Sequence, residues 1–117
     1  MSLKAYKDTQ TATEDPRVTE YRLFGQVTGA LLNAKQSNAA GSQLVEAVDW
    51  NRRLWRTLAA DCMDDRNKLT QDVRAKIISL SLWVAKYSRN VTREKAPLDP
   101  LIEINRNIMQ GLQARAG

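Results

Sequence analysis

The feature that most restricts the fold is an apolar stripe in the middle of the chain. Apolar residues recur there every three or four positions, which places them on one side of an α-helix rather than on one face of a strand. Asn51 is the only polar member of the stripe, and Asp49 precedes Arg53 by the four residues that favour a helical ion pair. We therefore predict a helix after a possible N-cap at Ser42, with this stripe: Leu44, Ala47, Val48, Asn51, Leu54, Trp55, Leu58, Ala59 and Cys62.

Three other segments carry signals for the start of a helix. Asp15-Pro16 and Asp99-Pro100 each combine a residue suited to capping with a proline suited to the first turn. Thr70 is a third candidate cap. The helices that follow have apolar residues at helical spacing, among them Leu23, Phe24, Val27 and Leu31 in the first and Leu101, Ile104, Ile108 and Met109 in the last.

The remaining segments are polar and read as connections. We expect a loop over residues 35–42, a polar turn over 64–68 and a linker over 93–96. Residues 1–15 form a polar arm ahead of a helical domain at residues 16–117. The sequence thus predicts an all-α, single-domain antiparallel bundle of about four helices with a polar N-terminal arm.

A glycine pair interrupts the first predicted helix. Gly25 and Gly29 lie four residues apart, and each weakens a helix by about 1 kcal/mol relative to alanine. The pair indicates either a close approach of another backbone or two tolerated surface positions.

The third predicted helix is apolar on two sides. Its main stripe is Val73, Ile77, Leu80, Val84, Tyr87 and Val91, whereas Ala75, Ile78, Leu82 and Ala85 form a second stripe nearly opposite, with Trp83 on the flank. Such a helix is either central in a bundle or half covered by something outside the chain. We expect the first or fourth helix of the chain itself to cover the second stripe.

Two missing features exclude much of enzyme chemistry. The chain has one cysteine, Cys62, and no histidine, so it has no intrachain disulfide, no cysteine–histidine zinc site and no usual base for a nucleophile. Cys62 belongs to an apolar stripe and is expected to be a buried, inert thiol. No glycine-rich phosphate loop is present. We therefore expect no enzymatic activity, no cofactor and no metal.

The N-terminal residues are polar and mixed in charge, without the apolar segment of a signal peptide. No stretch approaches the roughly 20 apolar residues that span a bilayer. We expect a cytoplasmic protein without membrane contact.

The charge balance leaves two kinds of partner open. A net charge of +5 and a pI near 9.7 suit nucleic acid as well as an acidic protein. We favour a solvated face with local ion pairs for the basic residues, and we see no known RNA-binding module. Trp50 and Trp83 lie on the flanks of their stripes and suit either the core or an interface. The basic candidates on two helices are Arg52, Arg53, Arg56, Lys86, Arg89 and Arg93.

Four segments, in order and spacing, resemble one protein family over nearly the whole chain. They are Thr13-Glu14-Asp15-Pro16-Arg17, Asn51-Arg52-Arg53-Leu54-Trp55, Ile78-Ser79-Leu80-Ser81-Leu82-Trp83-Val84 and Pro100-Leu101-Ile102-Glu103-Ile104-Asn105-Arg106-Asn107-Ile108-Met109-Gln110-Gly111-Leu112. With these segments the chain resembles the FlaF family of flagellar proteins. The resemblance implies a regulator that promotes flagellin synthesis and export, binds flagellin as a secretion chaperone and works with a second regulator, FlbT.

The leading hypothesis is a cytoplasmic flagellin chaperone and regulator of flagellum assembly. The alternatives are an RNA-binding regulator of the flagellin message and a helical adaptor for FlbT. The third predicted helix and the two basic groups supply the candidate partner-binding residues, which are Ile78, Leu82, Trp83, Trp50, Arg52, Arg53, Lys86 and Arg89.

Overall fold

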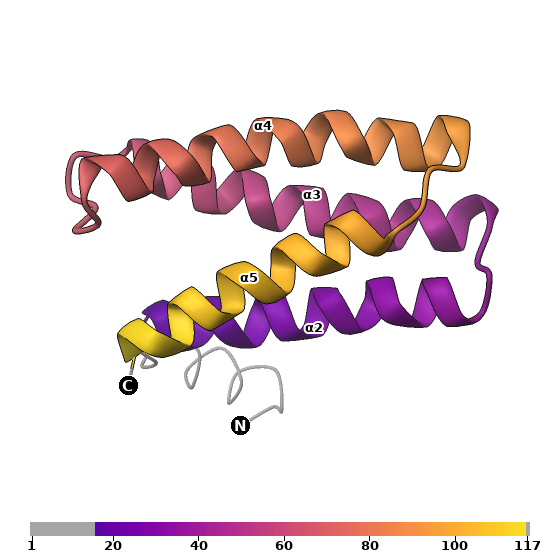
Figure 1. Ribbon diagram of the computed structural model, residues 1–117, viewed down its shortest axis with the longest axis horizontal. Coiled ribbons are helices and arrows are strands. Elements are labelled where there is room, and N and C mark those ends of the chain that lie inside the picture. Colours follow the sequence, from indigo (N-terminus) through magenta and orange to yellow (C-terminus); the bar gives the residue numbers. More distant parts are fainter. Residues whose placement is uncertain (1–15, 117) are drawn as a thin grey trace, which may run out of the picture.

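The protein is an all-α bundle of antiparallel helices, as the sequence predicts (Figure 1). A computed structural model describes the backbone of residues 16–116 and the side chains of residues 19–111; the predicted arm at residues 1–15 lies outside this range. The helices in the described part are α2 (Pro16–Gln36), α3 (Gly41–Met63), α4 (Gln71–Glu94) and α5 (Asp99–Ala116).

The helix α3 occupies the middle of the bundle. It packs against α2 on one side and against α4 on the other. The last helix, α5, starts near the C-terminal end of α4 and then crosses obliquely in front of α3 to pack along α2 (Figure 1). None of the other helices in the described part of the chain therefore packs against the outer side of α4.

The helix starts agree with the sequence signals in most cases. The helix α2 begins at Pro16, and Thr70 caps α4 by accepting a hydrogen bond from the Val73 amide at 3.3 Å. The prediction that Ser42 caps α3 is wrong, because α3 begins at Gly41 and its N-cap, Ala40, makes no side-chain hydrogen bond. Asn38, with a φ angle of 50°, ends α2 in left-handed backbone, and the Ala39 amide donates there to the Ala34 carbonyl at 2.9 Å. Gly41, with a φ angle of 60°, then turns the chain into α3.

The connection between α3 and α4 is the predicted polar turn. Arg66 pairs with Asp64 at 2.8 Å within it. Arg74, from the first turn of α4, donates to the main-chain oxygens of Cys62 at 2.6 Å and Asp64 at 3.1 Å. These carbonyls at the end of α3 have no helical partner, so Arg74 closes that end and ties the two helices together.

The core joins all four helices around two aromatic side chains. Phe24 of α2 and Trp55 of α3 are fully buried and meet edge to face, with ring centroids 5.4 Å apart. The stripe of α3 and the main stripe of α4 face this core, as predicted. The largest fully buried apolar side chains around the pair are Leu31, Leu101, Val27, Val84 and Val91.

A buried polar junction lies beside these aromatic rings. The indole N–H of Trp55 donates to Oδ1 of Asn105 at 2.8 Å, and Nδ2 of Asn105 donates to Oδ1 of Asn51 at 2.7 Å. Both asparagines are completely buried. The polar interruption in the α3 stripe is therefore the attachment point of α5, since a buried polar group needs a partner.

The glycine pair of α2 permits no special approach of another backbone. A Cβ atom added to Gly25 would lie 3.7 Å from Cε of Met109, an ordinary contact, and one added to Gly29 would meet nothing within 4 Å. The second of the two interpretations, tolerated glycines, fits these positions.

Candidate interaction surface

The outer side of α4 exposes the large apolar side chain most accessible to solvent among the described residues. Leu82 is 70% exposed, and Trp83 beside it is 39% exposed. The expectation that the chain's own helices cover this stripe is wrong for Leu82, because α5 leaves α4 to pack along α2. Ile78 is half-buried against the core, so the second stripe is covered along one edge only.

Trp83 is held in position by its neighbours. Its ring stacks on Tyr87 one turn later, with centroids 5.0 Å apart and planes 14° from parallel. The Tyr87 hydroxyl in turn donates to the Pro97 carbonyl at 2.7 Å. An aromatic side chain fixed in this way loses little conformational freedom when a partner covers it.

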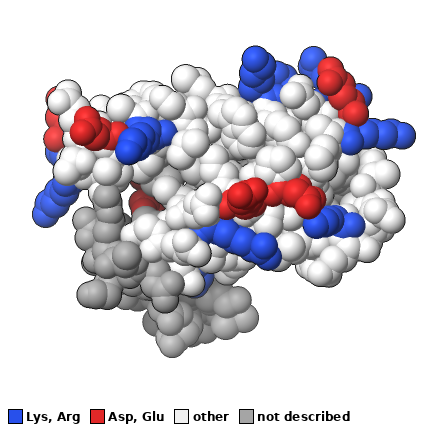
Figure 2. Space-filling view, in the orientation of Figure 1, with Lys and Arg blue, Asp and Glu red and all other residues white. Residues whose placement is uncertain are grey.

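An apolar groove separates α4 from α5 next to this pair. Leu80, one turn before Trp83, forms its α4 wall, and the groove has a volume of about 430 Å³. Figure 2 shows uncharged surface along α4 and between the two helices, with charged side chains gathered at the ends of the bundle and along α5. The α5 wall is lined by Pro100, Glu103, Ile104, Asn107 and Ile108.

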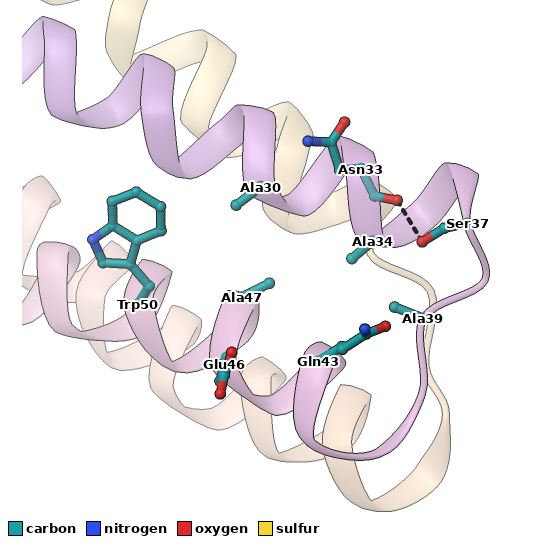
Figure 3. Close-up of a pocket in the computed structure, with 9 residues that line it drawn as sticks. All are labelled: Ala30, Asn33, Ala34, Ser37, Ala39, Gln43, Glu46, Ala47 and Trp50. Atoms are coloured by element: carbon teal, nitrogen blue, oxygen red, sulfur yellow. Dashed lines mark hydrogen bonds between the residues drawn. The ribbon is translucent and has the colours of Figure 1, made fainter.

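Trp50 belongs to a different surface. It stands at one end of a furrow of about 340 Å³ between α2 and α3 (Figure 3). The furrow exists because short side chains face each other across the two helices. Its lining comes from these two helices and their connection, namely Ala30, Asn33, Ala34, Ser37, Ala39, Gln43, Glu46, Ala47 and Trp50. The structure thus separates Trp50 from Trp83.

Arg52 and Arg53 share one carboxylate. Asp49 accepts from Arg52 at 2.6 Å and from Arg53 at 3.1 Å. The hydrogen bond from Arg52 is the main reason that the pKa of Asp49 is lowered, and the charges of both arginines act in the same direction. Part of the positive charge of this group is therefore compensated within the helix.

Lys86 and Arg89 are exposed, and neither forms an ion pair with any residue that the structure describes. The hydroxyl of Ser81 donates to the Trp55 carbonyl at 3.3 Å, which sets the antiparallel register of α4 against α3. In this register Arg52 lies level with Val84, and Lys86 and Arg89 follow within the next one and a half turns of α4. The two basic groups therefore occupy neighbouring levels, with Asp49 on the α3 side.

Cys62 is fully buried. Burial raises its pKa, Glu20 adds to the increase and Arg74 opposes it. A buried thiol that resists deprotonation is a poor nucleophile, which supports the interpretation of Cys62 as a structural residue. Among the described residues, no three cysteine or acidic side chains are grouped closely enough to hold a metal ion.

The raised pKa of Cys62 gives a pH dependence of stability. The folded state favours the protonated thiol, so this stabilisation is complete below the unfolded-state pKa of about 8.5 and decreases as the pH rises above it. We expect urea unfolding to show a lower free energy of unfolding at pH 9.5 than at pH 7.5. The variant Cys62→Ala should lose less stability over the same interval. An equal loss in both proteins would assign the effect to other groups.

The core junction and the α4 surface both come from the segments that carry the family resemblance. A scan against family models matches residues 2–112 to the family described as flagellar protein FlaF. The chain belongs to the FlaF family. Searches of the curated proteins and of the solved structures each give no significant match. None of the FlaF helices described here is long and apolar enough to cross a membrane.

In this FlaF-family chain, two of the resembling segments meet inside the fold. Asn51 and Trp55 come from one of them and Asn105 from the other, so these motif residues build the core. The segment Ile78–Val84 contributes to the core and to the surface of α4, since Val84 is buried and Leu82 is exposed. Sequence reasoning missed the groove wall on α5 and the role of Asn105, although a polar residue within the apolar spacing of the last helix was a visible signal.

Proposed function

We propose that this FlaF-family protein binds flagellin in the cytoplasm as a secretion chaperone, and thereby promotes flagellin synthesis and flagellum assembly. The observation that supports the proposal is the exposed Leu82–Trp83 pair on α4, in a chain of a flagellar protein family. Binding would hold flagellin monomers by mass action and requires no chemical step.

The exposed pair suits a protein partner for a physical reason. Covering a large apolar side chain stabilises a complex by about 1.5–3 kcal/mol when burial is complete. Tryptophan is among the residues that most often anchor interfaces. Leu82 and Trp83 are consecutive in α4, and the groove at Leu80, one turn before Trp83, gives a partner side chain a place to insert.

Two tryptophans with equal exposure provide a matched test of the surface. Trp83 and Trp50 are both 39% exposed but lie on different faces. We expect Trp83→Ala to weaken binding of purified flagellin monomer by about tenfold or more, which corresponds to about 1.4 kcal/mol. Trp50→Ala should change the affinity by less than about threefold, within the range of a side chain outside an interface. Isothermal titration calorimetry measures both, and circular dichroism checks that both variants fold.

If Trp50→Ala weakened flagellin binding more than Trp83→Ala did, the result would place the flagellin site at the furrow between α2 and α3. A wild-type protein that does not bind flagellin at any salt concentration would contradict the proposed function. FlbT, the second partner that the resemblance implies, is tested in the same assay. Binding of FlbT with the same dependence on Trp83, in the absence of flagellin binding, would support the adaptor role in place of the chaperone role.

A further inference from the structure

The helix α4 has an unusual distribution of charge. From Val73 to Arg93 it contains no acidic residue, whereas it contains five basic ones. The Arg74 guanidinium donates hydrogen bonds to the carbonyls at the end of α3. The other four, which are Lys76, Lys86, Arg89 and Arg93, are exposed and form no ion pair with any described residue.

These cations stand on both sides of the exposed apolar pair. Lys76 lies six residues before Leu82 and Arg89 lies seven residues after it. At about 1.5 Å per residue, the charged flanks are roughly 20 Å apart along the helix axis. At 3.6 residues per turn, Lys86, Arg89 and Arg93 follow on the side of α4 that carries Leu82, and Lys76 precedes on the side that carries Trp83. The surface is therefore an oblique strip with an apolar centre and cations beyond both ends.

Several basic side chains elsewhere in the bundle form ion pairs with aspartates. Lys35 pairs with Asp99 at 3.0 Å, Arg66 with Asp64, and Arg52 and Arg53 with Asp49. The α4 cations have no such partner in the described part of the chain. Two acidic residues of α5 lie near this strip: Glu103 lines the far wall of the groove, and Asp99, which pairs with Lys35, adds to the raised pKa of Tyr87.

The shape of the strip indicates a helical partner. A second helix packs its side chains between the ridges of α4. Its apolar side would cover Leu82 and Trp83. Carboxylates on its flanks would meet the unpaired cations, and lysines there would be repelled.

We infer that the flagellin segment bound by α4 is an amphipathic helix whose apolar side is flanked by carboxylates. This inference rests on the proposed function and specifies the chemistry of the partner segment.

Charge reversal on α4 tests the inference with flagellin itself. We expect Lys86→Glu/Arg89→Glu to weaken flagellin binding by at least about tenfold and to reduce its dependence on salt between 50 and 300 mM, as expected when charges at an interface rim are removed. A matched control, Lys68→Glu/Arg106→Glu, makes the same change in net charge at exposed positions outside α4 and should bind nearly as the wild type does. Equal effects of both double variants would overturn the inference.

Two synthetic helical peptides separate the inference from the proposed function. They share one apolar stripe and differ in carrying either glutamates or lysines along its flanks. We expect the glutamate peptide to bind the wild-type protein at least about tenfold more tightly and to lose that advantage on Lys86→Glu/Arg89→Glu. Equal binding of the two peptides would overturn the inference, even if flagellin binds through Trp83. A clear preference for the glutamate peptide without any flagellin binding would sustain the partner chemistry and contradict the proposed function.

Nucleic acid is the competing occupant of these cations. Single-stranded RNA that binds at low salt, displaces the glutamate peptide and loses affinity steeply with salt would indicate a phosphate-binding surface. That result, together with RNA binding that is unaffected by Trp83→Ala, would overturn the inference of a helical partner.

Discussion

Replacing Asn105 by alanine is expected to lower the free energy of unfolding by about 2–6 kcal/mol. The change removes the acceptor of the Trp55 indole N–H and the donor to Asn51, and it leaves two buried polar groups without partners. Each such group costs about 1–3 kcal/mol. Because a small domain is stable by only about 5–15 kcal/mol in total, the variant should unfold at a much lower urea concentration.

Asn107→Ala is the matched control, since Asn107 is an exposed asparagine on the same helix. It should change the stability by less than about 0.5 kcal/mol. A double-mutant cycle that combines Asn105→Ala with Asn51→Ala adds a second readout. If the two asparagines act through one hydrogen bond, the loss in the free energy of unfolding for the double variant should differ from the sum of the two single losses. A small effect of Asn105→Ala, or additive effects in the cycle, would contradict the role of the junction.

Replacing Phe24 by alanine is the second large change. Phe24 is fully buried and packs edge to face on Trp55. Its removal leaves a cavity between α2 and α3, and substitutions of this kind cost about 3–5 kcal/mol. Thermal and urea unfolding monitored by tryptophan fluorescence measure the loss, and the signal also reports on the ring beside the cavity.

Tyr21→Ala is the control for Phe24, because Tyr21 is an aromatic residue on the same helix that is 37% exposed. Its removal should cost clearly less than the removal of Phe24. Phe24→Leu, which keeps part of the volume, should fall between wild type and Phe24→Ala. If Tyr21→Ala lost as much stability as Phe24→Ala, burial of the side chain would not explain which substitution costs more.

Most of the fold could be predicted from the sequence, because helical periodicity is a local signal. The α3 stripe, the Thr70 cap and the start of α2 at Pro16 are confirmed. The start of α3 was predicted wrongly, since Asn38 and Gly41 make the turn with left-handed backbone. Several residues in that loop could cap a helix, and their choice depends on how α2 and α3 pack.

The surface was harder to predict than the fold. A helix with two apolar sides is compatible with coverage by its own chain or with exposure, and the path of α5 decides between them. That path depends on contacts between residues about 50 positions apart, such as Trp55 with Asn105. The same limitation applies to Trp50 and Trp83, which have similar positions on their stripes but lie on separate faces.

The Asn105 junction has a consequence for the position of α5 along its axis. Apolar contacts alone tolerate sliding, because the residues of α5 that face the bundle repeat at every turn. A slide by one turn, about 5.4 Å, would break both hydrogen bonds of Asn105 and leave three buried polar groups without partners. The junction thus fixes the position of α5 along its axis. It thereby also fixes Ile104 and Ile108 in the wall of the groove beside α4.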